Sequence, residues 1–323
     1  MNNLTIIMYH YVRDIKNSKY PYIKGLDINL FKEQIGYLRK HYHIISIEDV
    51  IYSIDNQIKI PEKSLLLTFD DAYLDHYTNV FPVLDKYKLK GSFYVPSKVI
   101  MENTILDVNK IHFILASVED KLNIVNDLKE LLRVYQKEYQ LEDFDYYYKK
   151  LAYANRFDTK EVMFIKHLLQ VELVEVLRIK IVDTLFVKYI GMSENAFSRE
   201  LYMNEEQLRH MLRSGQHIGS HGHNHYWWNS LNKEEISKEL DLSINFLEKL
   251  GVDMNNWTAC YPYGSYDVQS SKMLEERGCK LAVTTEVDIA TTNKNTRFIM
   301  PRLDANDMPQ DQSQETNDWY AKG

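Results

Sequence analysis

Short apolar segments that alternate with amphipathic helical segments constrain the fold of this chain more than any other feature. Phe31, Ile35 and Leu38 recur at helical spacing, a second helical segment covers Ile47–Ile54, and the strand-like run Leu65–Leu67 follows it. Repeated βα units favour a mostly parallel sheet that closes or nearly closes into a barrel. Further strands are expected at residues 43–46, 92–95 and 217–220, in the segment ending at residue 261, and at residues 281–285 and 298–303.

Composition limits the class of protein. The chain has 323 residues, of which 45% are hydrophobic, so it can bury a large core as one elaborated domain or two. A formal net charge of −7, without any block rich in lysine or arginine, argues against a general nucleic-acid-binding protein. The only two cysteines, Cys260 and Cys279, do not make a disulfide framework, and buried packing is expected for Cys260.

The amino-terminal sequence MNNLTIIMYHYV has neither the basic start nor the long apolar region of a secretory signal. No stretch of the chain approaches the roughly 20 apolar residues that a membrane-spanning helix needs. The sequence therefore predicts a cytoplasmic protein without a transmembrane segment.

Two short motifs carry the residue types that metal-assisted hydrolysis requires. TFDDAY places Asp70 and Asp71 directly after an apolar run, and SHGHNH places His221 and His225 four residues apart after another strand-like segment. This chemistry needs three protein ligands on a divalent ion, an open position for water, and a separate base that takes the proton from the water. Two imidazoles and two carboxylates can supply all of these groups.

These motifs resemble those of the polysaccharide deacetylases, the NodB homology domain of carbohydrate esterase family four. TFDDAY resembles the first motif, T-F-D-D-G; SHGHNH resembles the second, H-[ST]-x-x-H; and CYPYG at Cys260–Gly264 resembles the third, R-x-P-[FY]. The resemblance covers roughly residues 1–100 and 200–305 and implies a distorted (β/α) barrel with fewer than eight strands. We therefore expect a catalytic barrel from residues 1–101 and 200–309, while residues 102–199, which do not fit the family core, are expected to be a helical insertion and the polar residues 310–323 a loose tail.

The resemblance also implies roles for individual residues. Asp70 would be the catalytic base, and Asp71, His221 and His225 would hold one divalent metal, with zinc expected and cobalt, nickel or iron also suited to these ligands. Consecutive side chains at a strand end point to different sides, which agrees with one ligand and one free carboxylate. His223 would share a face with both imidazoles on an extended segment but not in a helical turn, and the pair with Asp71 is favoured.

The third motif would supply the backbone N–H of Tyr263 to the developing oxyanion. The side chains of Tyr263 and Tyr261, with the cluster Tyr226–Trp228, either form walls against which a sugar ring packs or belong to the core and its rim.

The chain departs from the family pattern at two positions. Cys260 stands where the third motif has its arginine, and Arg302 is the candidate replacement that would orient the base. No histidine follows His225, so the usual late histidine that serves as general acid is absent. In the subset that deacetylates poly-N-acetylglucosamine, a Tyr-His pair after the first strand is similar to Tyr9-His10, which makes His10 the candidate acid. The alternative for His10 is a buried or capping histidine.

Residues 102–190 contain neither glycine nor proline, while apolar residues recur at helical intervals. This helical insertion could close the catalytic pocket, bind a protein partner or serve as added scaffold. The remaining histidines at positions 41, 43, 76, 112, 167 and 210 are interpreted as ordinary surface or packing residues, and His217 is placed at the start of a strand.

The function expected from these features is metal-dependent hydrolysis of an N-acetyl group from an acetamido sugar in surface-polysaccharide or lipopolysaccharide biosynthesis. Removal of a formyl or other short acyl group from a nucleotide- or lipid-linked sugar is an alternative within the same enzyme class. A carbohydrate-binding module that has lost catalysis is the alternative outside it.

Overall fold

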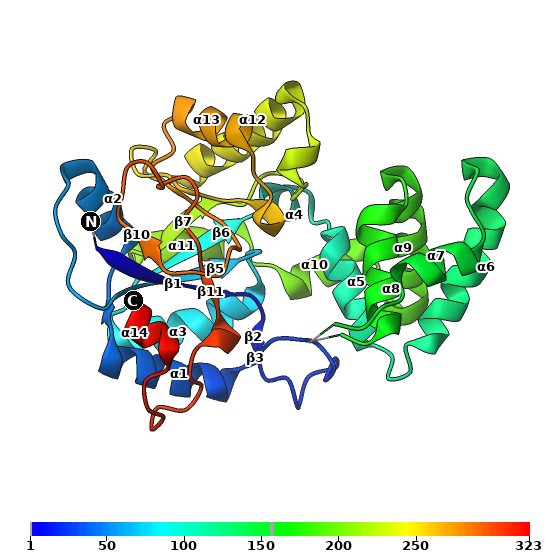
Figure 1. Ribbon diagram of the computed structural model, residues 1–323, viewed down its shortest axis with the longest axis horizontal. Helices are drawn as coiled ribbons and strands as arrows, with labels where there is room; N and C mark the ends of the chain where they lie inside the picture. Colours follow the sequence, from blue (N-terminus) through cyan, green and yellow to red (C-terminus); the bar gives the residue numbers. More distant parts are fainter. Residues whose placement is uncertain (1, 156–157) are drawn as a thin grey trace. The chain divides into compact units, whose positions relative to one another are not determined.

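The computed structural model describes residues 2–155 and 158–323, and the chain divides into two compact units (Figure 1). The first unit contains the chain up to Asp14 together with Gly25–Thr104 and Ser198–Gly323. The second contains Ile15–Lys24 and Ile105–Phe197. The sequence expectation placed an insertion at residues 102–199 and did not include the short segment before Gly25.

The first unit is built on a nine-stranded sheet in which seven strands follow one another in the order β10-β1-β5-β6-β7-β8-β9. β1 pairs in parallel with β5, and the strands from β5 to β9 continue in parallel, whereas β10 runs antiparallel to β1. Two strands lie off this path: β11 pairs in parallel with β1, and β4 with β5. The bounds are β1 Asn3–Tyr9, β4 His43–Ile44, β5 Ser64–Asp70, β6 Gly91–Val95, β7 His217–Ser220, β8 Ala259–Cys260, β9 Ala282–Val283, β10 Ala290–Thr291 and β11 Leu303–Asp304.

The segment before β11 joins the two ends of the sheet. The Thr284 N–H donates to the Met300 carbonyl at 2.9 Å, and the Met300 N–H donates to the Ala282 carbonyl at 3.1 Å. Because β11 then pairs with β1, the sheet closes into a distorted barrel. The predicted α/β barrel with fewer than eight strands along its path is confirmed. β2 (Val12–Arg13) and β3 (Leu26–Asp27) form a separate parallel pair.

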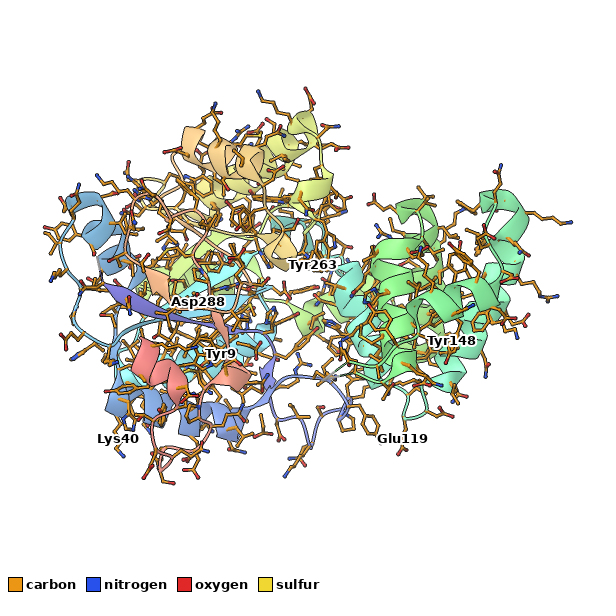
Figure 2. The ribbon with its side chains drawn as sticks, viewed as in Figure 1. Tyr9, Lys40, Glu119, Tyr148, Tyr263 and Asp288 are labelled. Atoms are coloured by element: carbon orange, nitrogen blue, oxygen red, sulfur yellow. The ribbon has the colours of Figure 1, made fainter. Side chains whose placement is uncertain are left out.

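β5 shows why a continuous apolar run becomes a central parallel strand. All seven of its residues are buried, since barrel strands are covered on both faces. The ring of Phe69 stacks between Tyr9 of β1 and Phe93 of β6, with centroid distances of 5.0 and 4.7 Å (Figure 2 labels Tyr9). This packing holds the carboxyl ends of three neighbouring strands in fixed register, and the candidate site lies at these ends.

The predicted helices of the first unit form, and several begin with reciprocal caps. Ser46 caps α2, Asn204 caps α11 and Asn232 caps α12, each in a capping box. The helices are α1 Ile28–His41, α2 Ile47–Asn56, the π-helical turn η1 His76–Val80, α3 Phe81–Tyr87, α4 Ser97–Glu102, α11 Glu205–Arg213, α12 Lys233–Leu250, α13 Val268–Glu276 and α14 Asp318–Lys322.

The carboxyl-terminal segment differs from the loose tail expected for residues 310–323. It contains α14, and Lys63 Nζ donates to the Tyr320 carbonyl at 2.6 Å while Asn3 Nδ2 donates to the Lys322 carbonyl at 2.8 Å. Polar composition alone did not reveal these contacts, because both partners lie near the start of strands that are distant in sequence.

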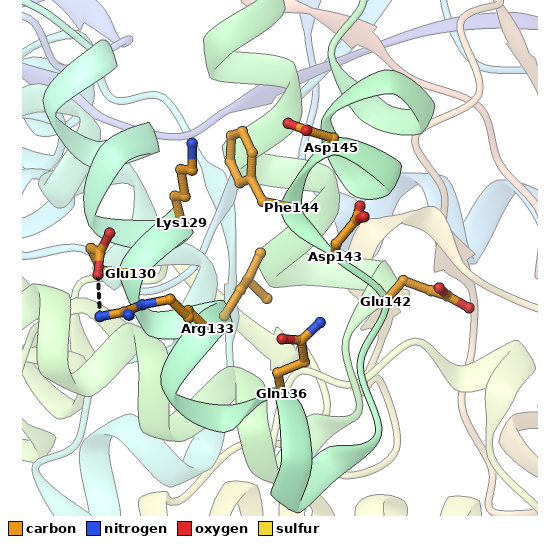
Figure 3. Close-up of a pocket in the computed structure, with 9 residues that line it drawn as sticks. Lys129, Glu130, Arg133, Gln136, Glu142, Asp143, Phe144 and Asp145 are labelled. Atoms are coloured by element: carbon orange, nitrogen blue, oxygen red, sulfur yellow. Dashed lines mark ion pairs between the residues drawn. The ribbon is translucent and has the colours of Figure 1, made fainter.

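The second unit is helical. Within it, the rings of Phe113 and Phe197 pack edge to face at 4.8 Å, and Tyr20 packs against both, which ties Ile15–Lys24 to this unit. A cavity between α6 and α7 is lined mainly by charged side chains, and an ion pair joins Arg133 and Glu130 at 3.1 Å (Figure 3). The helices are α5 Asp107–Ala116, α6 Leu122–Tyr139, α7 Phe144–Leu151, α8 Lys160–His167, α9 Glu175–Ile190 and α10 Glu194–Leu201, which continues into the first unit. In the described parts of the chain, no helix combines the length and hydropathy needed to span a membrane.

Candidate active site

The two aspartates of TFDDAY lie where β5 ends and the chain turns sharply. Asp70 is the last residue of the strand, whereas Asp71 and Ala72 have left-handed backbone angles, with φ of 75° and 56°. The turn is held because the Ala72 carbonyl accepts a hydrogen bond from the Met203 N–H at 3.0 Å. As a result the two buried carboxylates face different partners, as the sequence predicted.

Asp70 is bound by Arg302 through two parallel hydrogen bonds. Arg302 Nη1 donates to Oδ1 at 2.9 Å and Nη2 donates to Oδ2 at 2.7 Å, and both side chains are buried. Arg302 Nε donates to the Thr284 carbonyl at 2.7 Å, which fixes the guanidinium plane. Burial alone would raise the pKa of Asp70, but the charge and hydrogen bonds of Arg302 outweigh it and hold this pKa well below its usual range. Asp70 is therefore a carboxylate at neutral pH.

Cys260 lies beside this pair. Its Sγ is 3.5 Å from Asp70 Oδ2 and 3.1 Å from Arg302 Nη2. Burial raises the pKa of the thiol well above its usual value, although the charge of Arg302 opposes this, so Cys260 stays protonated. Arg302 thus makes the contact with Asp70 that the sequence expected of a replacement arginine. Its role in turnover stays a prediction.

Asp71, His221 and His225 form a compact buried triad. Asp71 Oδ1 lies 3.6 Å from Nε2 of His221 and 3.5 Å from Nε2 of His225, and the two Nε2 atoms are 3.3 Å apart. Ligand atoms at about 2.1 Å from a tetrahedral ion lie about 3.4 Å from one another. Asp71 Oδ1 has no hydrogen-bond donor among the described residues, although it is buried. Asp71 Oδ1 and the two Nε2 atoms are therefore placed so that they can bind one divalent cation together.

Neighbouring groups orient the triad. Tyr73 Oη donates to Asp71 Oδ2 at 2.5 Å. His221 Nδ1 lies 2.8 Å from the Cys260 carbonyl, which can only accept, so Nδ1 carries the proton and Nε2 presents its lone pair. Burial lowers the pKa of His225 to about 3, helped by His221 and opposed by Asp71, so this ring is neutral, as a metal ligand must be. Tyr73 belongs to TFDDAY but was not among the expected site residues.

The chain after β7 bends so that His223 leaves the triad. Gly222 and His225 have left-handed φ angles of 72° and 61°, which end the extended segment. His223 Nδ1 instead lies 2.8 Å from Ser97 Oγ. The structure thus brings His221 and His225 together with Asp71 and places His223 as a neighbour, in the arrangement that the sequence favoured.

His10 follows β1 and lies close enough to the carboxylates for its charge to lower the pKa of both Asp70 and Asp71. Its carbonyl accepts a hydrogen bond from Nε2 of His76 at 2.8 Å. His76, expected to be an ordinary surface or packing residue, is fully buried and begins the turn η1. No local pattern marks this contact, because the two residues are 66 positions apart. The acid role of His10 stays a prediction.

The burial of His76 predicts a loss of stability in acid. Burial lowers its pKa from 6.5 to about 4, against the opposing hydrogen bond to His10, so the folded state holds this ring neutral while the unfolded chain binds a proton below pH 6.5. Stability from this group is complete above pH 6.5 and is lost as the pH falls towards 4. Between pH 7.5 and 4.5, urea unfolding of the wild type should lose about 2.5 kcal/mol more than that of His76→Gln, which has no titrating group. If both proteins lose the same unfolding free energy over this pH range, the lowered pKa of His76 is contradicted.

The aromatic residues near the third motif divide into two sets. The ring of Tyr263, which Figure 2 labels, stacks on Trp227 at 4.3 Å with an interplanar angle of 3° and meets His225 at 4.6 Å. Trp227 is 38% exposed, so this pair borders the triad on an accessible side. Tyr261, in contrast, is 0% exposed, and its hydroxyl lies 3.1 Å from Ser271 Oγ, while its ring packs against the buried Trp228.

Tyr261 therefore does not form a wall open to a sugar ring, and that expectation is corrected. Tyr261 follows directly after β8, and its side chain turns into the layer between the barrel and α13. Tyr263 has a left-handed φ of 57°, which carries it out of that layer. Donation of its N–H to an oxyanion stays a prediction.

A parallel barrel with a buried Asp-His-His triad and a separate ionised aspartate at its carboxyl-terminal end has the site architecture of a metal-dependent hydrolase. The family model described as polysaccharide deacetylase matches residues 57–140 and 178–282, which is more than half of the chain. The protein belongs to the polysaccharide deacetylase family.

Two curated relatives match shorter segments. YxkH of Bacillus subtilis (strain 168) is 29% identical over 98 residues, which cover 30% of this chain and 33% of the relative. The poly-beta-1,6-N-acetyl-D-glucosamine N-deacetylase of Escherichia coli (strain K12) is 31% identical over 88 residues, 27% of this chain and 13% of that protein. The matches thus span a third or less of the relatives' length.

Solved structures share the fold over nearly the whole chain. The Streptococcus pyogenes deacetylase PplD, in complex with acetate, superposes with a TM-score of 0.59 at 17% identity and covers 95% of this chain and 93% of its own. IcaB from Ammonifex degensii gives a TM-score of 0.54 at 17% identity, with 100% and 95% covered. At these identities the likeness establishes the fold.

Proposed function

We propose that the protein is a metal-dependent carbohydrate N-deacetylase that removes the acetyl group from an amino sugar during surface-polysaccharide or lipopolysaccharide biosynthesis. One observation carries the proposal: Asp71, His221 and His225 converge within 3.6 Å of one another, while the adjacent Asp70 is bound by Arg302 and lies outside this triad. The arrangement provides a cation site and, beside it, a separate ionised carboxylate that can act as a base. Hydrolysis of an unactivated amide requires both.

The residues can divide the reaction among themselves. A divalent ion held by Asp71, His221 and His225, most simply zinc, would polarise the acyl oxygen and lower the pKa of a bound water. Asp70 accepts the proton of the attacking water, and Arg302 keeps its carboxylate aligned and ionised. The N–H of Tyr263 donates to the acyl oxygen as negative charge develops.

Collapse of the tetrahedral centre breaks the C–N bond and requires a proton on the departing nitrogen. His10 donates this proton, because an imidazole can be protonated near neutral pH and because His76 fixes the backbone from which it projects. The products are acetate and the free amino sugar.

The substrate proposal has separate support. The Escherichia coli relative is named for poly-β-1,6-N-acetyl-D-glucosamine, and its similarity to this chain, although short, favours an acetamido polymer. The exposed Trp227, stacked on Tyr263 beside His225, offers an aromatic face for a sugar ring. A nucleotide- or lipid-linked precursor is the alternative substrate, and a cytoplasmic location stays a prediction.

Acetate release from a panel of substrates tests the proposal. The panel contains β-1,6-linked N-acetylglucosamine oligomers, a nucleotide-linked N-acetyl sugar and the matching N-formyl compounds, each assayed with zinc, with cobalt and after chelation. Release of acetate that stops on chelation and returns with metal is expected. Release of formate alone would establish a short-acyl amidohydrolase instead.

A third outcome separates the enzyme from a binding module. Saturable binding of the oligomers by the metal-loaded protein, with no acyl product at any pH between 5 and 9, would refute deacetylation. The ion pair between Arg302 and Asp70 argues against this outcome, because it supplies the base orientation that the loss of the motif arginine at Cys260 put in question.

A further inference from the structure

The loop between the two metal-binding imidazoles rests on a carboxylate from another element. Glu239, in the second turn of α12, is buried with 3% exposure. Its Oε2 accepts the N–H of His223 at 3.0 Å and the N–H of Asn224 at 2.8 Å, and its Oε1 accepts from Asn224 Nδ2. The carboxylate thus takes three hydrogen bonds from two consecutive residues that lie between His221 and His225.

The other side of the same loop is held by α4. The N–H groups of Ser97 and Lys98, at the start of that helix, donate to the carbonyls of Gly222 and His223 at 3.1 and 3.2 Å. The first N–H groups of a helix lack partners within the helix, so they are available for this contact. The loop is therefore clamped through its carbonyls by α4 and through its N–H groups by Glu239.

The clamp explains how the loop keeps an unfavourable shape. His225 has a left-handed φ of 61°, which is uncommon for a residue with a side chain, and the same turn aims its Nε2 at Asp71 Oδ1. Gly222 is also left-handed, and a Cβ at this position would lie 3.3 Å from Glu239 Oε2 and from Trp228 Nε1. The carboxylate, the glycine and the indole therefore fit together closely beneath the loop.

We propose that Glu239 is a positioning residue of the metal site: it sets the spacing of the His221 and His225 imidazoles through the backbone that joins them. A carboxylate suits this task because it only accepts hydrogen bonds, and the His223 and Asn224 groups that bond to it are N–H donors. The inference rests on the proposed metal-dependent function and adds a residue outside the sequence motifs.

Cobalt binding tests the role without any assay of turnover. We would measure the affinity for Co²⁺, in competition with a chelator and without substrate, for the metal-free wild type, Glu239→Ala and Glu239→Gln. The visible spectrum of each cobalt-loaded protein then reports the ligand geometry. Changes to groups that orient metal ligands weaken metal affinity by about 10–100-fold, and this loss is expected for Glu239→Ala, with an altered spectrum. Glu239→Gln keeps one acceptor oxygen and should show a smaller loss.

Glu235→Gln is the matched control, since Glu235 lies one turn earlier on α12, is exposed and serves the capping box, which glutamine also completes. Its affinity and spectrum should equal those of the wild type.

If Glu239→Ala does not fold, Glu239→Gln carries the comparison. If a variant at Glu239 is less stable without metal but binds cobalt with wild-type affinity and spectrum, the positioning role of Glu239 is overturned, and the proposed function is not affected. Failure of the wild type to bind cobalt would overturn the proposed function as well.

Discussion

Asp70→Asn should lower kcat by about 10²–10⁴-fold, the usual contribution of a positioned general base, while the protein still binds one equivalent of metal. The amide has nearly the size of the carboxylate and keeps an oxygen that can accept from Arg302, but it cannot take a proton from water. The triad of Asp71, His221 and His225 does not include this side chain, so metal content should not change. Acetate release and metal content measured on the same preparations check both parts of the prediction.

The substitution also leaves Arg302 buried without its counter-charge. Removing one partner of a buried ion pair costs about 3–5 kcal/mol of stability, so activity must be compared well below the unfolding temperature of the variant. Asp267→Asn is the matched control, because Asp267 is the N-cap of α13 and asparagine caps a helix equally well. Full turnover by Asp70→Asn would show that the base has been assigned to the wrong residue.

His221→Ala should lose the metal itself. The substitution removes Nε2 from a set of three donor atoms and also the hydrogen bond from Nδ1 to the Cys260 carbonyl. The fall in affinity should exceed the roughly 10–100-fold that changes around the ligands produce. Metal content after dialysis and the rise in unfolding temperature on addition of zinc are the two measurements.

Metal at 100 times its dissociation constant should stabilise the wild type by about 2.7 kcal/mol and should leave His221→Ala unchanged. His210→Ala is the matched control, because His210 lies on the exposed side of α11 and contacts Tyr77 rather than the site. A zinc-dependent rise in His221→Ala equal to that of the wild type would refute the ligand set. Together with Asp70→Asn, this variant separates loss of the base from loss of the metal.

Local patterns predicted the elements well where periodicity and capping agree. The apolar run before Asp70 became β5, and the stripe Phe31, Ile35 and Leu38 became the buried face of α1. The prediction of the last strands was less accurate. One strand was expected at residues 298–303, but β11 contains only Leu303 and Asp304. There the chain pairs first with the segment of β9 and then with β1, and such a change of partner leaves no periodic pattern.

In the candidate site, too, local motifs predicted some residues, whereas others depend on contacts between distant segments. The motifs contained Asp70, Asp71, His221 and His225, and the structure brings Asp71 and both imidazoles to one point. Arg302 could be named only as a candidate, because its contact with Asp70 depends on β1 lying between β5 and β11. No contact with the site was expected for His76, and Glu239 was not named at all. Each acts on the backbone of a distant residue, so neither needs a recognisable neighbour in sequence.

The sequence by itself determined which side chains can ligate a cation, which can exchange a proton, and that they follow strands of a parallel α/β fold. These properties are local, since they depend on residue type and on the period of a short segment. Only the tertiary structure decided that Arg302 binds the Asp70 carboxylate, that Tyr261 is buried while Tyr263 borders the triad, and that α4 and α12 contact the loop between His221 and His225. Those outcomes depend on strand order and on hydrogen bonds between segments far apart in the chain.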